Sequence, residues 1–116
     1  MISRGLFSVA VLLLAATVGM AQDAKKVSTA EALDNAVTKV QPTYPASARQ
    51  LKIEGKVDVE AIVNPDGTVD DVQIKSGNPI LTRAATDALK RWKFKPFMAD
   101  GKPVKAVAPV SFTFKL

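Results

Sequence analysis

Cysteine and histidine are both absent from this chain of 116 residues. Without cysteine there is no disulfide framework and no thiolate metal site, and without histidine the commonest general base and metal ligand are missing. The part of the chain that is richest in carboxylates holds Asp58, Glu60, Asp66, Asp70 and Asp71. They fall on the polar face and in the turn of a predicted hairpin, where solvation and turn bonding account for them, and their spacing does not match a calcium loop. We therefore predict no catalytic residue, no metal site and no cofactor.

Charge does not point to one class of partner. Hydrophobic residues make up 47% of the chain and charged residues 23%, which is typical of one globular domain, and the formal net charge is +5. Basic residues gather around Trp92 and Phe94, namely Lys90, Arg91, Lys93, Lys95, Lys102 and Lys105. The aromatic spacing fits core packing better than a nucleic-acid stacking platform, so we predict no nucleic-acid partner. A contact with anionic lipid or an acidic partner stays open.

The N-terminal residues 1–21 have the layout of a secretory signal peptide. Arg4 precedes an apolar stretch from Leu6 to Val18, and the small residues Gly19 and Ala21 predict cleavage before Gln22. A short uncleaved signal anchor is the alternative, although the apolar run is shorter than the roughly 20 residues of a spanning helix. We interpret residues 22–40 as a linker or a short amphipathic helix capped by Thr29.

The stretch from Gly55 to Ser76 has the pattern of a β-hairpin. Apolar residues occupy every second position from Val57 to Val63, the period of a strand with one buried face. Asn64-Pro65-Asp66-Gly67 is a turn sequence, and a second strand follows in which the doubled Asp70-Asp71 predicts a bulge.

A helix beginning near Pro79 or Ile80 is predicted to cover the apolar face of this hairpin, because apolar residues recur at helical spacing as far as Trp92. After a turn at residues 99–103, apolar and polar residues alternate to the end of the chain. Pro109 cannot donate to a ladder, so we place this last strand at a sheet edge. The predicted core comprises Val57, Val59, Val63, Val72, Ile74, Leu81, Ala85, Leu89, Trp92, Phe94, Phe112 and Phe114.

Two proline steps hold Gln41-Pro42-Thr43-Tyr44-Pro45 extended ahead of the hairpin. Pro45 suits the first turn of a helix that continues to Leu51 and that Gly55 would end. Tyr44 alone carries little functional signal, and we expect its ring to pack on the domain while its hydroxyl stays in water.

Taken together, these residues resemble the C-terminal domain of TonB, the periplasmic part of the energy transducer for outer-membrane transporters. The resemblance covers residues 41–116 and rests on the order and spacing of short pieces: Gln41-Pro42-Thr43-Tyr44-Pro45, Ala48, Ile53-Glu54-Gly55, the alternating strand, Pro65-Asp66-Gly67, Val72 to Ser76, Arg91-Trp92-Lys93-Phe94 with Pro96, and the last strand. It implies an α+β fold, a three-stranded antiparallel sheet with two helices in the order α-β-β-α-β, located in the periplasm.

The resemblance also implies a partner. In that family the domain binds the TonB box, a short extended segment at the N-terminus of an outer-membrane transporter, which adds to the sheet beside the last strand. The residues this assigns to partner binding are Gln41, Pro42, Tyr44, Pro45, Val107, Ala108, Val110, Ser111, Phe112 and Thr113. The family's full transducers also contact an inner-membrane proton-driven motor, which we expect here only if residues 1–21 are retained as an anchor.

Two other interpretations of the domain stay open. An exposed sheet edge can pair with the same edge of a second copy, which would make the domain a dimeric scaffold. An enzyme would need a pocket with perturbed carboxylates, which this sequence does not indicate.

Overall fold

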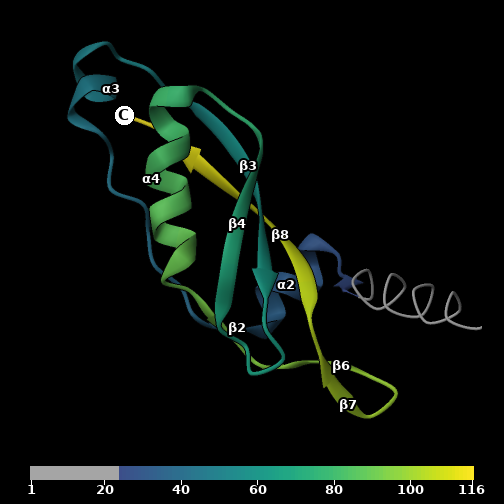
Figure 1. Ribbon diagram of the computed structural model, residues 1–116. Coiled ribbons are helices and arrows are strands. Elements are labelled where there is room, and N and C mark those ends of the chain that lie inside the picture. The colour runs from purple at the N-terminus through teal and green to yellow at the C-terminus, as the bar shows by residue number, and fades with distance from the viewer. Residues whose placement is uncertain (1–23) are drawn as a thin grey trace, which may run out of the picture.

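A computed structural model describes residues 24–116 of the chain, and the segment predicted as a signal peptide lies outside them (Figure 1). No helix within 24–116 is long and apolar enough to cross a membrane. In chain order the elements are β1 (Lys25–Lys26), α2 (Thr29–Asn35), β2 (Ala36–Thr38), α3 (Ala46–Gln50), β3 (Gly55–Val63), β4 (Val69–Ser76), α4 (Pro79–Lys90), β5 (Lys93–Phe94), β6 (Phe97–Ala99), β7 (Lys102–Val104) and β8 (Ala106–Phe114).

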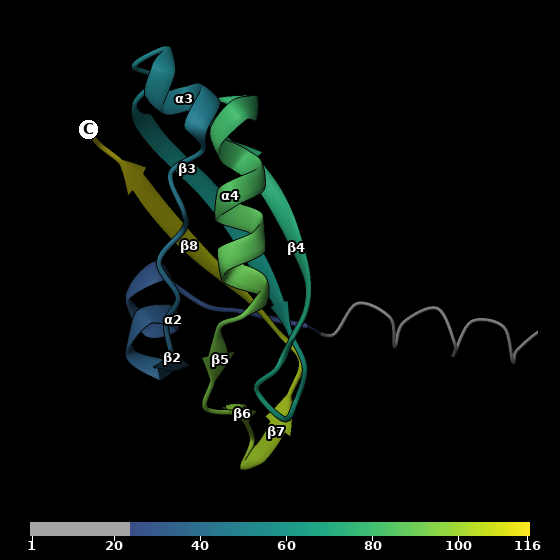
Figure 2. The ribbon, with the colours of Figure 1, turned by 90° about the vertical axis from the view of Figure 1, so that its left-hand side faces the viewer.

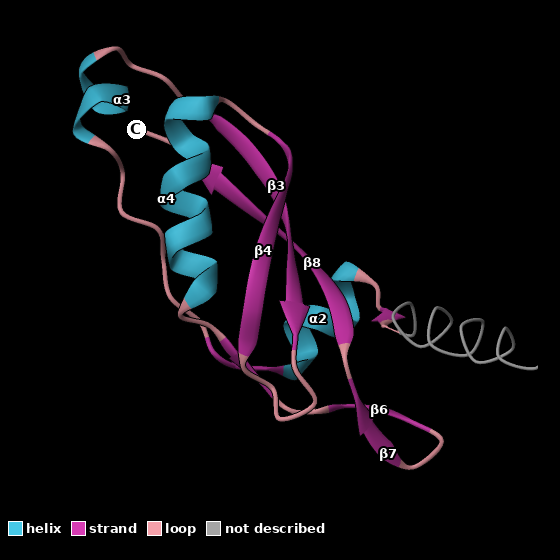
Figure 3. Ribbon diagram, in the orientation of Figure 1, coloured by secondary structure: helices cyan, strands magenta, loops and turns pink. Residues whose placement is uncertain are grey.

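The three long strands form an antiparallel sheet in the order β8-β3-β4, and β1 adds a short parallel strand beyond β8. Helix α4 lies against this sheet, and α3 lies near the N-terminal end of α4 (Figures 1 and 3). The predicted α+β class and the antiparallel arrangement of the three strands are confirmed. The structure adds β1 and two small sheets, β2-β5 and β6-β7, that were not predicted.

The hairpin between β3 and β4 closes at the predicted turn. The Gly67 amide donates to the Asn64 carbonyl at 2.9 Å, and the Thr68 amide donates to the Asp66 carboxylate at 3.0 Å. Ile62 lies opposite Asp71 and Val63 opposite Val69, so Asp70 is the extra residue of the predicted bulge. A second register shift between Asp58 and Val59 was not predicted.

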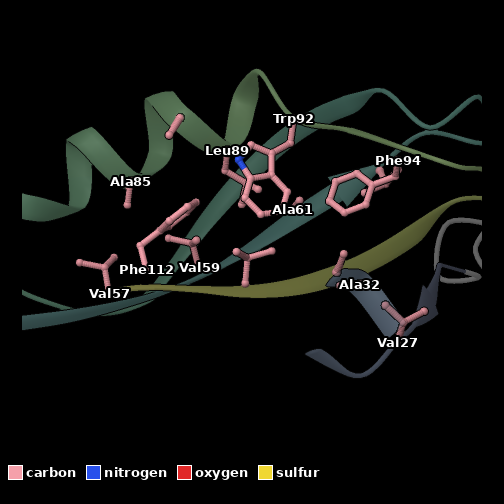
Figure 4. Packing of buried hydrophobic residues seen from close by; sticks show 14 of the residues in the cluster. Val27, Ala32, Val57, Val59, Ala61, Ala85, Leu89, Trp92, Phe94 and Phe112 are labelled. Atoms are coloured by element: carbon pink, nitrogen blue, oxygen red, sulfur yellow. The ribbon is translucent and has the colours of Figure 1, made fainter. Parts of the chain in front are cut away.

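The core lies between α4 and the sheet. In Figure 4, the side chains of Val57 and Val59 on β3 and of Phe112 on β8 lie on the face of the sheet that is turned toward α4. Ala85 and Leu89 of α4 face them from the helix. The aromatic rings of Trp92 and Phe112 meet edge to face with centroids 5.7 Å apart. Ten of the twelve predicted core residues are buried: Val57, Val59, Val63, Leu81, Ala85, Leu89, Trp92, Phe94, Phe112 and Phe114.

The prediction for Ile74 is wrong, because 52% of its surface is exposed, and Val72 is only partly buried. Ile74 lies opposite the buried Val59, so the two side chains share one face of the sheet. However, β4 is the outermost strand of the sheet. Within residues 24–116, no strand lies beyond it to cover the outer side of Ile74.

Helix α3 ends at Gln50, five residues before the predicted stop at Gly55. Lys52 takes a left-handed conformation with φ of 55°. The amide of Lys52 donates to the carbonyl of Arg49 at 3.2 Å. The amide of Ile53 donates to the carbonyl of Ala48 at 2.8 Å. This is the hydrogen-bond pattern of a Schellman cap, whose left-handed position usually holds glycine.

Replacing Lys52 with glycine is therefore expected to raise the free energy of unfolding by about 0.5–1 kcal/mol, since glycine takes positive φ without steric cost. Chemical denaturation measures the change. Gln50→Gly is the matched control, because it places glycine inside the same short helix, where it should destabilise by roughly the same amount. A loss of stability in both variants would contradict the role given to Lys52.

Residues 24–38, predicted as a linker or a short helix, form a folded segment that packs on β8 through α2. The cap of α2 is Ser28 and not Thr29: the Glu31 amide donates to the Ser28 hydroxyl at 3.1 Å. Ala32 is fully buried, and the Lys95 amide donates to the carbonyl of Asn35 at 2.7 Å. The segment thus belongs to the same core as the rest of the domain.

Candidate functional site

Strand β8 has one side paired along its whole length and the other side mostly open. Its residues pair with β3 from Ala106 opposite Val63 to Phe114 opposite Gly55. On the other side its only strand neighbour among residues 24–116 is β1, at Ala106 and Val107. From Ala108 to Phe114 β8 is therefore an edge strand, as the position of Pro109 predicted.

The backbone groups on this open side can be identified from the contact with β1. The carbonyls of Lys105 and Val107 accept hydrogen bonds from the amides of Lys25 and Val27. Successive residues of a strand direct their backbone groups to alternate sides, so Pro109, Ser111 and Thr113 face the same way as Val107. The open edge thus offers two amide donors, on Ser111 and Thr113, and three carbonyl acceptors.

Pro109 fits this geometry because it takes one of the outward positions. Its missing N–H would have pointed away from β3, so the β3–β8 ladder loses no hydrogen bond. Ala108, Val110 and Phe112, which the sequence assigned to partner contact, direct their backbone groups toward β3 instead. Their side chains are buried in the core.

The carboxylate of Asp58 joins the three long strands on the polar face beside this edge. Ser111 of β8 donates its hydroxyl to one oxygen at 2.5 Å, and Ser76 of β4 donates to the other at 3.1 Å. These bonds, the Ser111 bond first, hold the pKa of Asp58 below its ordinary value. Asp58 was predicted as a solvated surface residue, and pairing across strands could not be read from the sequence.

Acid is expected to weaken the domain partly through Asp58. A carboxyl whose pKa is lower in the folded state stabilises above its unfolded pKa of 3.8, and this contribution is lost as pH falls through the folded pKa. The unfolding free energy should therefore fall less between about pH 4 and pH 2 in Asp58→Asn than in the native chain. Since hydrogen bonds cause the shift, the difference should persist in about 0.5 M salt. Identical pH profiles would contradict this assignment.

Tyr44 lies near the C-terminal end of β8, but it also has a structural role. Its ring meets that of Phe114 edge to face with centroids 5.5 Å apart, and the Arg49 guanidinium lies 5.5 Å from its centroid. Its hydroxyl donates to the carbonyl of Ile53, so the expectation of a solvent-exposed hydroxyl is wrong. Burial, followed by the charge of Glu54, raises the pKa of Tyr44 above its ordinary value.

The other residues of the motif Gln41-Pro42-Thr43-Tyr44-Pro45 line a groove beside α4. Segment 40–45 runs along this helix (Figure 2), anchored where the Trp92 indole N–H donates to the Val40 carbonyl at 3.0 Å. The groove holds about 510 Å³. Its walls are Val40, Gln41, Pro42, Thr43, Pro45 and Ser47 on one side and Pro79, Ile80, Arg83, Ala84, Asp87, Ala88 and Arg91 on the other. Gln41 is exposed.

The second long edge of the sheet, on β4, is less suited to accept a strand. It is interrupted by register shifts next to Ile62 and Asp58 of β3, which break the regular spacing of its backbone groups. Charged side chains lie on it as well, and Lys75 forms an ion pair with Glu60 at 3.3 Å. Bulges and charges of this kind protect a natural edge against pairing. No cluster of potential metal ligands occurs among residues 24–116.

Comparisons of the sequence and of the structure with known proteins point to the same family. The sequence profile of the family described as Gram-negative bacterial TonB protein C-terminal matches residues 40–116. Protein TonB of Escherichia coli strain K12 is 42% identical over 83 residues, which cover 70% of this chain and 33% of that protein. Protein TonB of Klebsiella pneumoniae is 38% identical over 95 residues, covering 80% of this chain and 37% of that protein.

A solution NMR structure of the Pseudomonas aeruginosa TonB CTD superposes with a TM-score of 0.58 and 32% identity, covering 70% of this chain and 84% of that one. This chain spans about a third of the length of the Escherichia coli and Klebsiella pneumoniae proteins. The family match over residues 40–116 includes α3, α4 and the three long strands β3, β4 and β8.

Proposed function

Because the chain belongs to the family of Gram-negative TonB C-terminal domains, we propose that it is a non-enzymatic periplasmic module that binds the TonB box of an outer-membrane transporter by strand addition. The observation that carries the proposal is the open edge of β8, where the backbone groups of Ser111 and Thr113 have no strand partner in the described part of the chain. An extended segment that adds to such an edge gains main-chain hydrogen bonds, which supply affinity with little dependence on sequence.

Specificity would come from side chains of residues 41–45. Tyr44 covers Phe114 at one end of β8, and the exposed Gln41 lies farther along the same motif. We propose that Gln41 contacts the bound segment directly. Tyr44 would hold the motif in place through its bond to Ile53. The proposed role is the capture of a transporter segment for energy-coupled transport, and a motor contact belongs to the proposal only for a chain that keeps residues 1–21.

The test is the affinity of a fluorescein-labelled synthetic TonB-box peptide, measured by anisotropy. Gln41→Ala should weaken binding severalfold, whereas Tyr44→Phe should lower stability by about 1 kcal/mol through loss of one hydrogen bond and change affinity less. A peptide with proline at alternate positions, which cannot form a ladder, is the control for strand pairing. Failure of the native peptide to bind the folded native chain would overturn the proposal.

Sedimentation of the same sample separates this function from edge-to-edge dimerisation. A dimer formed through β8 would use the edge that the peptide needs, so peptide would dissociate it. We expect a monomer at micromolar concentration whose mass increases only by that of the peptide. A stable dimer unaffected by saturating peptide would place the peptide elsewhere and contradict the proposal.

A further inference from the structure

The edge of β8 is already occupied at its beginning by a strand of the same chain. Strand β1 runs parallel to β8, with Lys25 opposite Ala106 and Lys26 opposite Val107. The amides of Lys25 and Val27 donate to the carbonyls of Lys105 and Val107 at 2.8 and 3.1 Å. Val107, one of the residues assigned to partner contact from the sequence, therefore has its outward carbonyl in use.

Strand β1 is held there by more than these two bonds. Val27 is only 8% exposed and belongs to the hydrophobic core, together with Ala32 of the following helix (Figure 4). The Lys25 ammonium donates to the Met98 carbonyl at 3.0 Å and lies 3.7 Å from the Glu31 carboxylate. Because β1 belongs to the same chain, it competes for the edge at a high effective concentration, whatever the amount of partner present.

We propose that β1 limits how far a partner strand can pair along β8, so that the chain selects a short segment bonded at Pro109, Ser111 and Thr113. The proposal deepens the function given above and rests on it. A segment long enough to reach Val107 must displace β1 and expose Val27. Residues of the partner beyond the open part of the edge therefore add no ladder bonds in the native chain.

The experiment is a length series of the TonB-box peptide, extended one residue at a time at either end, tested against the native chain and three variants. Val27→Pro removes the amide that bonds to Val107. Lys25→Pro removes the amide that bonds to Lys105 and leaves the buried Val27 in place. Lys26→Pro is the matched control, because the Lys26 amide lies between the two and points away from β8. Circular dichroism checks that each variant is folded.

In the native chain and in Lys26→Pro, affinity should rise with length until the open edge is filled and then change less than twofold. In Val27→Pro and Lys25→Pro it should rise about tenfold further over two more residues at the end that faces β1, as expected for two added hydrogen bonds. Equal length dependence in all four proteins would overturn the role of β1 and leave the proposed function intact. Failure of every peptide to bind every folded protein would overturn the proposed function and this inference with it.

Discussion

Replacing Gly67 with alanine is expected to remove about 3–5 kcal/mol of stability. Gly67 has φ of +92°, and a Cβ built on it would lie 1.9 Å from the carbonyl oxygen of Phe94. The turn cannot move away easily, because the Phe94 amide donates to the Gly67 carbonyl at 2.9 Å. Since small domains are stable by only about 5–15 kcal/mol, we expect a largely unfolded or severely weakened protein in chemical denaturation.

Gly101→Ala is the matched control for this prediction. Gly101 also has positive φ, 76°, but a Cβ there would meet nothing within 4 Å. Only the conformational cost applies, so the loss should be about 1 kcal/mol. Equal losses in the two variants would mean that the close approach of Phe94 to the turn does not matter for stability.

Replacing Thr113 with proline should lower the affinity for the TonB-box peptide at least tenfold while the fold survives. Thr113 is exposed, and its outward amide is one of the two donors that we assign to the open edge. Proline removes that donor and leaves the facing acceptor of the partner strand without a hydrogen bond. Because the amide points away from β3, no hydrogen bond of the β3–β8 ladder is lost, as Pro109 already illustrates at an equivalent position.

Thr113→Ala is the control for the side chain, since it keeps the amide and should bind the peptide within about twofold of the native chain. Anisotropy titration measures both variants, and thermal unfolding shows whether they remain folded. Native affinity in folded Thr113→Pro would exclude this edge as the peptide site. A similar loss in Thr113→Ala would assign binding to the side chain instead of the backbone.

Much of the fold could be predicted because its signals are local. Alternation of apolar residues identified the strands, Asn64 to Gly67 the turn, the doubled aspartate the bulge and Pro79 the start of α4. Strand β1 could not be found, because two lysines carry no strand pattern and are held by hydrogen bonds to residues about eighty positions away in the chain. Lys52 was missed for a similar reason, since left-handed lysine has no distinctive sequence signal.

The candidate site was predictable only in outline. Pro109 indicated an edge strand, because proline tolerates only one orientation there. Since the backbone of Pro109 must face outward, alternation along the strand would also have placed Ser111 and Thr113 outward, a signal that the assignment of Val110 and Phe112 to partner binding left unused. The prediction for Tyr44 failed in one respect, since its bond to Ile53 depends on how α3 ends.

Hydrogen exchange of the backbone amides with and without the TonB-box peptide tests the central claim most directly. In the free protein, the outward amides of Ser111 and Thr113 have no strand partner among residues 24–116. They should exchange faster than the amide of Phe112 between them, which bonds to β3. Saturating peptide should protect Ser111 and Thr113 strongly and leave β4 unchanged. Protection along β4 or beside α4, with Ser111 and Thr113 still exchanging freely, would contradict strand addition at β8.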